Sequence, residues 1–329
     1  MPKGDFMKFL TSAETIERLK NGEVVAIPTE TVYGLAADAR NNDAVAKIFT
    51  AKGRPSDNPL IVHIGDVTQV DELVTTITPD ARRLMDAFWP GALTIILPST
   101  GVVSGLVTAG LSTVGLRIPS HPLTLSLLRE SGIPLAAPSA NLSGKPSPTK
   151  ATHVATDLDG RIAGILDGGS CEIGLESTVI DMTTEQPTIL RPGGVSLAAI
   201  ESVLGRKVLV SKGANHQPKA PGMKYAHYAP DAKVYIVKGS SEYFTKTINQ
   251  FKAKVDSKIG ILCCEPASID VSGSVVVKSI ENGKNLYNAF REFDAEGVQV
   301  ILCEYQEDAA IMNRLMKASE ERVLSEVED

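Results

Sequence analysis

Residues 52–63 read Lys-Gly-Arg-Pro-Ser-Asp-Asn-Pro-Leu-Ile-Val-His, and the rest of the chain can be understood around this stretch. Its two prolines exclude a regular helix between them, because proline lacks a backbone N–H and restricts the residue before it. The apolar run at its end predicts a buried strand over 60–65, interrupted by His63. The stretch therefore predicts a stiff, exposed loop that holds two cations, Lys52 and Arg54, beside a sheet edge.

A loop with these two cations suits a polyphosphate ligand. An arginine guanidinium offers a planar fork of donors, and a lysine ammonium is a mobile point charge. A solvated basic turn is the alternative, and the stretch alone does not decide between the two. If the loop binds phosphate, replacing Lys52 or Arg54 by alanine should remove activity and leave the fold intact, because we expect the loop to be exposed.

The composition of the 329-residue chain is that of an ordinary globular protein, with 43% hydrophobic and 22% charged residues. This length allows two domains with a large core. No apolar run of about 18 residues is present, so we expect no membrane-spanning helix, and Met1 to Phe9 lacks the apolar core of a signal peptide. The four cysteines have neither zinc spacing nor a disulfide pattern, which favours reduced thiols in the cytoplasm.

The net charge of −6 is unevenly distributed along the chain. Residues 1–205 carry 16 Lys and Arg against 22 Asp and Glu, and residues 232–329 carry 12 against 16. Residues 206–231 carry 5 against 1, a charge of +4. An acidic body argues against dedicated nucleic-acid binding. The basic segment, with its prolines and a glycine, predicts a linker between two domains, 1–205 and 232–329.

Strands and helices alternate with short links in the first domain, which predicts a layered α/β fold. Two adjacent strands near its end have no helix between them, so we expect a mixed sheet. The expected helices are 12–21, 42–51, 79–88, 122–131, 149–158 and 196–204. The expected strands are 23–28, 60–65, 92–97, 114–118, 134–137, 162–166, 177–182 and 187–191, with a polar turn over 29–35.

The same alternation restarts after the linker and predicts a smaller, Rossmann-like α/β domain. This domain lacks a Gly-x-Gly-x-x-Gly fingerprint, so no dinucleotide is implied. Its expected strands are 233–237, 258–263, 274–278 and 298–303, and its expected helices are 241–254, 282–294 and 307–319.

Polar and cationic side chains recur where strands of the first domain end, which is where open α/β sheets bind ligands. Arg117 and Arg191 belong to apolar strands, and a buried arginine is costly unless it is paired or liganded. Pairing with Glu30 or Glu176 is the alternative to a ligand. No P-loop or kinase motif is present, and no Gly-x-Ser-x-Gly elbow points to a serine nucleophile. The other polar candidates at strand ends are Thr29, Thr31, Ser139, Asn141, Ser177 and Thr178.

Six motifs stand out between residues 28 and 230. They are Pro28-Thr-Glu-Thr-Val-Tyr-Gly-Leu35, Lys52-Gly-Arg-Pro with Asn58-Pro-Leu60, Pro138-Ser-Ala-Asn-Leu-Ser-Gly144, Ser177-Thr-Val179, Arg191-Pro-Gly-Gly194 and Pro221-Gly-Met-Lys-Tyr-Ala-His-Tyr-Ala-Pro230. Together they resemble the threonylcarbamoyl-AMP synthase family, the YrdC-like proteins. The last motif and the trailing domain resemble the long, two-domain form. The resemblance implies a twisted, mixed YrdC-like sheet with helices on both faces.

The resemblance also implies an enzyme, a nucleotidyltransferase that makes threonylcarbamoyl-AMP and pyrophosphate from L-threonine, bicarbonate and ATP. A partner complex then transfers the threonylcarbamoyl group to an adenosine of tRNA. Mg²⁺ is expected with ATP, held mostly by phosphates and water. The chain itself is expected to bind neither nucleic acid stably nor a membrane.

Residue roles follow from the same resemblance. Because both reactants are anionic, such a site neutralises and aligns them more than it moves protons, so no acid–base dyad is needed. Lys52 and Arg54 would be catalytic. The implied threonine ligands are Thr31, His63, Arg117, Ala137 and Ser177. The implied ATP ligands are Lys52, Arg54, Asn58, Thr113, Ser139, Asn141, Ser147, Arg191 and Tyr225.

Three other functions stay open at this point. An RNA-binding module would use the four cations Lys52, Arg54, Arg117 and Arg191. A carbamoyltransferase of the hydrogenase-maturation type contains a similar domain, but the zinc-finger cysteines and acylphosphatase domain of that class are missing here. A non-catalytic protein that binds threonine would show the amino-acid site without turnover.

The linker carries a hypothesis of its own. Tyr225, His227 and Tyr228 lie in residues 206–231, and aromatic rings are costly to leave in water. We therefore expect this segment to be a lid over the first domain's site, which would protect a labile mixed anhydride from water. The alternative is that the tyrosines only hold the two domains together.

Overall fold

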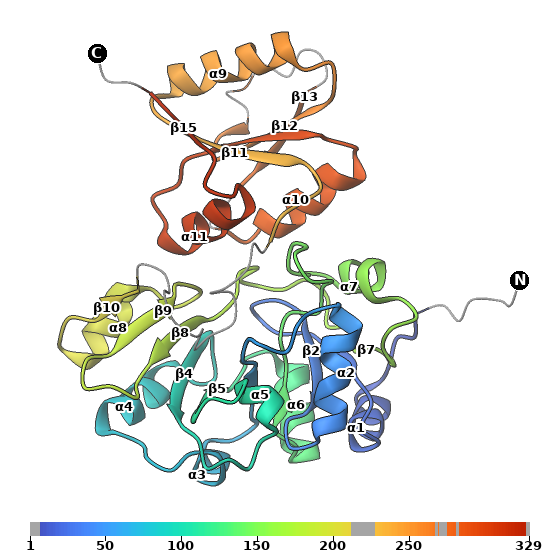
Figure 1. The fold of residues 1–329 in the computed structure, drawn as a ribbon, viewed down its shortest axis with the longest axis vertical. Helices are drawn as coiled ribbons and strands as arrows, with labels where there is room; N and C mark the ends of the chain where they lie inside the picture. The colour runs from blue at the N-terminus through green and yellow to red at the C-terminus, as the bar shows by residue number, and fades with distance from the viewer. Residues whose placement is uncertain (1–6, 212–227, 267–268, 270–274, 281–282, 327–329) are drawn as a thin grey trace, which may run out of the picture. The chain divides into compact units, whose positions relative to one another are not determined.

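The computed structural model describes residues 7–211, 228–266, 269, 275–280 and 283–326. The chain divides into two compact units. The first unit comprises Met1–Ser143 and Ser147–Tyr225, and the second comprises Gly144–Pro146 and Ala226–Asp329. Figure 1 shows the elements of both units, labelled in chain order.

The first unit is built on a mixed sheet, as the sequence predicted. Its strands are β1 (Val25–Ile27), β2 (Gly34–Asp38), β3 (Ile61–His63), β4 (Leu93–Pro98), β5 (Thr113–Arg117), β6 (Leu135–Ala136), β7 (Gly164–Ile165), β8 (Thr178–Asp181), β9 (Thr188–Arg191) and β10 (Leu209–Val210). They lie in the order β10-β9-β8-β4-β5-β3-β6-β2-β1-β7. β5 pairs with β3 in parallel and with β4 in antiparallel orientation. The adjacent strands β8 and β9 form an antiparallel pair.

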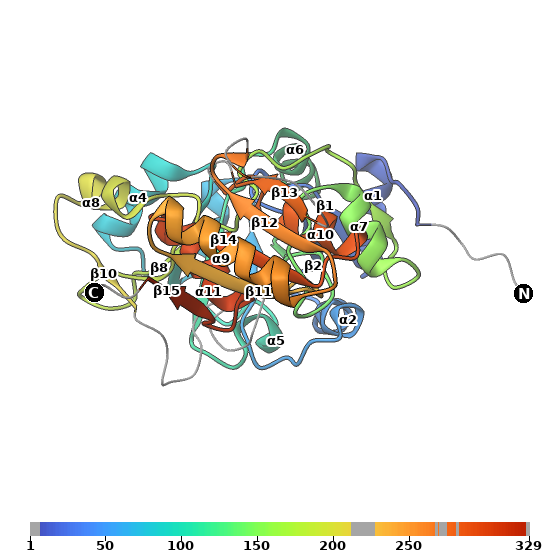
Figure 2. The same ribbon diagram turned by 90° about the horizontal axis from the view of Figure 1, so that it is seen from above.

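Helices cover this sheet on both faces. They are α1 (Ser12–Lys20), α2 (Asn42–Lys52), α3 (Val70–Leu73), α4 (Pro79–Phe88), α5 (Gly105–Thr108), α6 (Pro122–Ser131), α7 (Ala151–Leu158) and α8 (Leu197–Leu204), with a 3₁₀ turn, η1 (Val67–Gln69). Figure 2 shows α1 and α6 on one side of the strands and α2 and α5 on the other. The larger apolar core includes side chains of α2, α4, α5, α7 and α8, and a second core lies under α1 and α6.

Local sequence signals explain where several helices begin and end. α1 has a capping box, in which Thr11 N–H donates to Glu14 Oε2 at 2.8 Å and Glu14 N–H donates to Thr11 Oγ1 at 3.3 Å. α4 and α6 begin with proline, whose missing N–H costs nothing in the first turn. α2 ends at Lys52 because Gly53 has a φ of 60°, a conformation that favours glycine.

The structure corrects the sequence predictions at several short elements. The turn predicted over 29–35 ends in β2, a buried and alanine-rich strand that has no polar alternation to mark it. β10 lies in the segment predicted as a linker. It is an exposed strand, and among the described residues it pairs with β9 alone. The elements η1, α3 and α5 were not predicted either, because three or four residues are too few to show a helical period.

One face of this sheet has two halves of different character. The covered half lies under α1 and α6, and its side chains include Val25, Ile27, Ala36 and Leu135. On the same face, β3 places His63 opposite Leu135 and beside Arg117 of β5. Alternate residues of a strand share a face, so the register extends this face across β4 and β8. We call this second part the site half; its side chains are Ile61, His63, Thr94, Ile96, Thr113, Arg117 and Val179.

The site half is not packed against a helix layer in the way the covered half is. Its apolar cluster consists of Ile61, Ile96 and Val179, with Leu190 packed against them. All four residues belong to strands, so within the described residues no helix contributes to this cluster. The site half therefore has a mixed polar and apolar surface, whereas α1 and α6 pack against the covered half.

The second unit is a smaller α/β domain, as predicted. Its elements are β11 (Lys233–Lys238), α9 (Ser241–Lys254), β12 (Ile259–Cys263), β13 (Val275–Ser279), α10 (Leu286–Ala295), β14 (Val300–Glu304), α11 (Ala309–Ala318) and β15 (Val323–Ser325). The strand order is β13-β12-β14-β11-β15, and every pair is parallel. α9 covers one face of this sheet, and α10 and α11 cover the other (Figure 1). The strand β15 was not predicted.

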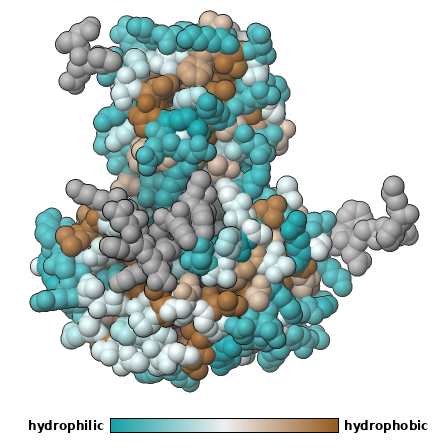
Figure 3. Space-filling model, in the orientation of Figure 1, coloured by the Kyte–Doolittle hydropathy of each residue, from teal (hydrophilic) through white to brown (hydrophobic). Residues whose placement is uncertain are grey.

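Part of the linker falls inside the described residues. Tyr228 is buried in the second unit, where its ring centroid lies 5.4 Å from that of Tyr287. Tyr225 and His227 lie outside the described residues, so the lid stays a prediction. No helix in the described parts of the chain is both long and apolar enough to cross a membrane. Outside the grey atoms of Figure 3, hydrophilic residues cover most of the visible face of each unit, and apolar residues form small separate patches.

Candidate active site

Arg117 ends β5 in the site half and is held by three acceptors. Its Nε donates to Gly91 O at 3.0 Å, its Nη1 to Thr31 Oγ1 at 2.9 Å and its Nη2 to Glu30 Oε1 at 2.5 Å. Arg117 is 3% exposed and Glu30 is 4% exposed, so the ion pair is buried. Glu30 is thus the partner that the sequence offered as the alternative to a ligand. These bonds use three of the five N–H groups of the guanidinium, and two remain for another acceptor.

The turn after β1 places Glu30 and Thr31 beside Arg117. Thr29 Oγ1 donates to Val32 O at 2.6 Å and lies 2.8 Å from Thr31 Oγ1. Because the Thr29 hydroxyl has only one proton, Thr31 donates in this second contact. The turn is therefore fixed by its own hydroxyl groups, and it holds Thr31 in position to accept from Arg117.

His63 ends β3 and is buried beside Arg117. Burial, and then the charge of Arg117, lower the pKa of His63 to about 3. The imidazole is therefore neutral near pH 7 and offers one donor and one acceptor nitrogen. Its Nδ1 is buried and has no hydrogen-bond partner among the described residues.

Arg191 ends β9 and is joined to the start of β8 through Ser177. Arg191 Nη2 donates to Ser177 O at 2.9 Å and to Ser177 Oγ at 3.2 Å. Ser177 Oγ lies 2.8 Å from Thr94 Oγ1. A chain of polar groups therefore crosses β9, β8 and β4, and it reaches the strand that neighbours Arg117.

Lys52 is buried, which corrects the prediction that this part of the loop is exposed. It is the last residue of α2 and is only 3% exposed. Its Nζ donates to Asn141 O at 2.7 Å and also to Ser139 O. Burial, and then the charge of Arg54, lower the pKa of Lys52 well below the usual lysine value. α2 continues as far as Lys52, the residue before Gly53. The ammonium group of Lys52 therefore contacts the backbone of the loop after β6.

Arg54 and Asn58 complete the stretch between α2 and β3. Arg54 is half-buried, and its Nη2 lies 3.5 Å from Asn58 O. Asn58 is fully buried. Arg54 is thus partly exposed, whereas Lys52 is buried, although both were predicted to be exposed. Only Gly53 separates the two cations in the sequence, yet their surroundings differ.

The loop after β6 connects these cations to the rest of the site. Asn141 is buried, and its Nδ2 donates to Leu142 O at 2.7 Å. Ser143 N–H donates to Lys52 O at 2.9 Å, so the loop is tied to the end of α2. Ser147 Oγ donates to Glu176 Oε1 at 2.6 Å, and both side chains are buried.

An apolar row lies beside the polar side chains of the site half. Gly115 of β5 pairs with Ile61 on one side and with Ile96 on the other. A Cβ atom on Gly115 would lie 3.3 Å from Thr94 Cγ2, so glycine keeps this row open. Thr113 begins the same strand, and Ala137 N–H donates to Ile61 O at 3.0 Å.

Most of the predicted site residues are therefore joined in the first unit by hydrogen bonds or strand pairing. One group surrounds the Arg117–Glu30 pair, and another follows Lys52 and the loop after β6. The predicted Tyr225 lies outside the described residues. The sequence did not single out Thr94, because a threonine in an apolar strand gives no motif. It named Glu30 as one of the polar residues after strand 23–28, and it named Glu30 and Glu176 as possible arginine partners.

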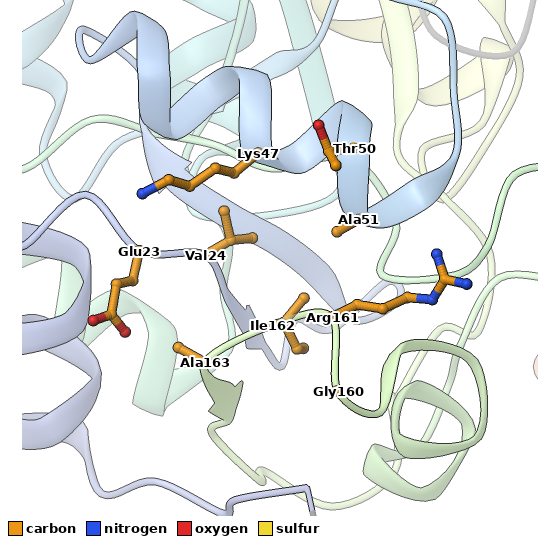
Figure 4. Close-up of a pocket in the computed structure, with 9 residues that line it drawn as sticks. All are labelled: Glu23, Val24, Lys47, Thr50, Ala51, Gly160, Arg161, Ile162 and Ala163. Carbon is orange, nitrogen blue, oxygen red and sulfur yellow. The ribbon is translucent and has the colours of Figure 1, made fainter.

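A cavity of about 500 Å³ lies elsewhere in the first unit, between α2 and residues 160–163, which precede β7. Figure 4 shows that the charged ends of Lys47, Glu23 and Arg161 do not converge on one point there. Lys47 Nζ donates to Gly22 O at 2.8 Å, and Glu23 pairs with Arg18. Specific sites combine a pocket with convergent polar groups, so size alone does not make this cavity the active site.

Comparison with known proteins agrees with this geometry. Residues 17–193 match the family model described as telomere recombination, Sua5/YciO/YrdC, and residues 195–320 match the model of the threonylcarbamoyl-AMP synthase C-terminal domain. The chain is 51% identical to threonylcarbamoyl-AMP synthase of Bacillus subtilis, covering 95% of this chain and 94% of the relative. It is 45% identical to the synthase of Pyrococcus abyssi, covering 93% of each.

A solved structure extends the likeness to the fold of the whole chain. The crystal structure of P. abyssi Sua5 complexed with L-threonine matches with a TM-score of 0.90 and 42% identity, over 98% of both chains. Both family models, the relatives and this structure agree, and the chain therefore belongs to the threonylcarbamoyl-AMP synthase family of nucleotidyltransferases.

Proposed function

We propose that this chain forms threonylcarbamoyl-AMP and pyrophosphate from L-threonine, bicarbonate and ATP. The observation that carries the proposal is the polar part of the site half, where His63, Arg117 and Ser177 lie in one connected sheet surface. Hydroxyl, imidazole and guanidinium groups are the partners that a small hydroxylated amino acid requires. The P. abyssi Sua5 structure with L-threonine supports the same assignment.

The ATP part of the site would use the cations on either side. Lys52 and Arg54 end α2 and open the loop before β3, and Arg191 ends β9. Cations stabilise the charge that develops when an anionic nucleophile attacks the α-phosphorus. In this proposal the apolar row of Ile61, Gly115 and Ile96 contacts the base.

In this proposal the chain's own residues position two anionic reactants and neutralise them. The threonine amine adds to bicarbonate and water is lost, which gives an N-carboxylate. This carboxylate then attacks the α-phosphorus of ATP and expels pyrophosphate. Neutral His63 adds no positive charge of its own, so the positive charge near the phosphates comes from Lys52, Arg54 and Arg191. A positioned pair of reactants gains effective concentration without an acid–base dyad.

Mg²⁺ enters this scheme as the companion of ATP. No group of three or more His, Cys, Asp or Glu side chains in the described residues is arranged to hold a metal. In this proposal the phosphates of ATP and water hold the ion. We also propose that a partner complex transfers the threonylcarbamoyl group to tRNA in the cytoplasm.

The test is pyrophosphate release by the full chain with ATP and Mg²⁺, with and without threonine and bicarbonate. We expect turnover only when both are present, and slower turnover with serine, because a missing methyl group is worth about 1 kcal/mol. Equal pyrophosphate release without threonine would contradict the proposal. Threonine binding without turnover would indicate a regulator, and salt-dependent RNA binding without turnover would indicate an RNA-binding module.

A further inference from the structure

Glu30 has two carboxylate oxygens, and the described residues account for only one of them. Oε1 accepts from Arg117 Nη2. Oε2 is buried and has no hydrogen-bond partner among the described residues. A carboxylate oxygen that is removed from water and has no donor is costly. Within the described residues, Glu30 Oε2 therefore lacks a hydrogen-bond donor.

The charge of this part of the site narrows the class of ligand that can supply the donor. Arg117 and Glu30 form a buried pair whose charges cancel. His63 beside them is neutral near pH 7 because of its burial. A net-neutral site with one fixed cation and one fixed anion suits a zwitterion, whereas a simple anion would meet the carboxylate of Glu30.

We propose that Glu30 binds the ammonium group of the amino-acid substrate through Oε2. Arg117, held by Oε1 of the same carboxylate, takes the substrate carboxylate with its two remaining N–H groups. This inference rests on the proposed function and adds a substrate-binding residue to it. It assigns Glu30 a second role beyond pairing with Arg117, which is the selection of an α-amino acid over the corresponding hydroxy acid without an amine.

The experiment compares two ligands on the full chain by isothermal titration calorimetry. One is L-threonine, and the other is (R)-3-hydroxybutanoate, which keeps the carboxylate and hydroxyl groups and lacks the amine. In the Glu30→Gln variant the amide oxygen still accepts from Arg117, but an NH₂ group replaces Oε2. We expect threonine binding to weaken by about ten- to a hundredfold, the range of a lost charge-assisted hydrogen bond. Binding of (R)-3-hydroxybutanoate should not weaken, because the variant removes a negative charge that this anion would otherwise meet.

The matched control is Glu23→Gln, which removes one negative charge from a partly exposed pair with Arg18 in the same unit. It should change neither affinity. The inference is wrong if Glu30→Gln weakens both ligands equally while the variant melts like the wild type, because Glu30 would then act only through Arg117. It is also wrong if the wild-type protein does not prefer threonine over the amine-free acid, a result that needs no variant. Failure of the wild type to bind threonine at all would instead overturn the proposed function.

Discussion

The covered half and the site half of one sheet face show how the same scaffold serves stability and chemistry. In the covered half, Leu135 of β6 packs with Leu127 and Leu128 of α6 in an apolar cluster. One strand further on, His63 takes the position opposite Leu135, and Arg117 lies beside it. The backbone pairing continues without interruption while the side chains change from apolar to polar.

The difference between the two halves shows which side chains stabilise the fold and which are available to bind a ligand. Apolar side chains under a helix layer remove surface from water and stabilise the fold. Polar side chains at the same depth must satisfy one another, as Arg117 does with Glu30, Thr31 and Gly91 O. Substitutions in the covered half should therefore change stability, and substitutions in the site half should change activity more than stability.

The largest effect is expected from Leu127→Ala in the covered half. Leu127 is fully buried, and truncating a buried leucine costs about 2–5 kcal/mol of unfolding free energy. The folded variant should keep the wild-type turnover, because the side chain packs in the apolar cluster of the covered half. Denaturant unfolding measures the loss, and pyrophosphate release per folded molecule measures the activity.

The counterpart is Ser177→Ala, directly before β8, where the serine hydroxyl contacts Thr94 of the site half. The substitution removes a hydroxyl that contacts Thr94 and Arg191, which should cost only about 1 kcal/mol of stability. Turnover with threonine should fall further than this. If Ser177→Ala lost as much stability as Leu127→Ala and kept its activity, the division of the face into two halves would be wrong.

A further comparison within the site separates the two cations Lys52 and Arg54. Each lost charge-assisted contact should slow turnover by about ten- to a hundredfold, or about 1.5–3 kcal/mol. Arg54→Ala should do so with unchanged stability, because the side chain is half-buried and its bond to Asn58 O is long. Lys52→Ala should also lower stability, because it removes the donor to Asn141 O and Ser139 O.

The conservative variant Arg54→Lys sharpens this test. A point charge does not reproduce the fork of the guanidinium, so turnover should recover only in part. Thermal melting of all three variants gives the stability comparison. A fully active Arg54→Ala protein would exclude a phosphate-binding role for this residue, and an unchanged melting temperature for Lys52→Ala would contradict the buried contacts described above.

The sequence predicted the long elements and left the short ones unmarked. Helices 79–88 and 122–131 have the predicted bounds, because proline starts each of them and an apolar face continues for several turns. β2 and β10 give no such signal, since one is alanine-rich and the other is held only by β9. Local sequence patterns predict helices well and two-residue strands poorly, because the formation of such a short strand depends on the strand with which it pairs.

The sequence predicted which residues belong to the site, but it did not predict which atoms they contact. The motifs identified Arg117 and Lys52, but burial of Lys52 depends on where α2 ends and on carbonyl groups 87 and 89 residues away. Thr94 and Gly91 O, which contact Ser177 and Arg117, could not be predicted because their roles follow from strand pairing and a backbone carbonyl. Long-range pairing therefore supplies what the local pattern lacks.

The smallest effect concerns His63 at the boundary between the two halves. Its pKa is lowered from 6.5 to about 3 by burial and by Arg117. The unfolded chain therefore binds a proton near pH 6.5 that the folded chain does not bind, so this group lowers stability as the pH falls below 6.5. Its contribution at pH 7.5 is close to zero, and at pH 5.5 it opposes folding by about 1 kcal/mol.

The measurement is denaturant unfolding of the wild type and of His63→Gln at pH 7.5 and pH 5.5. Between the two pH values the wild type should lose about 1 kcal/mol more unfolding free energy than the variant, since glutamine does not titrate. The matched control is Leu135→Met, directly opposite in the sheet, which should keep the wild-type pH dependence. Equal pH dependence of the wild type and His63→Gln would mean that His63 accepts a proton in the folded state. In that case the boundary between the halves would be open to water, and the neutral environment argued for the Arg117–Glu30 pair would not hold.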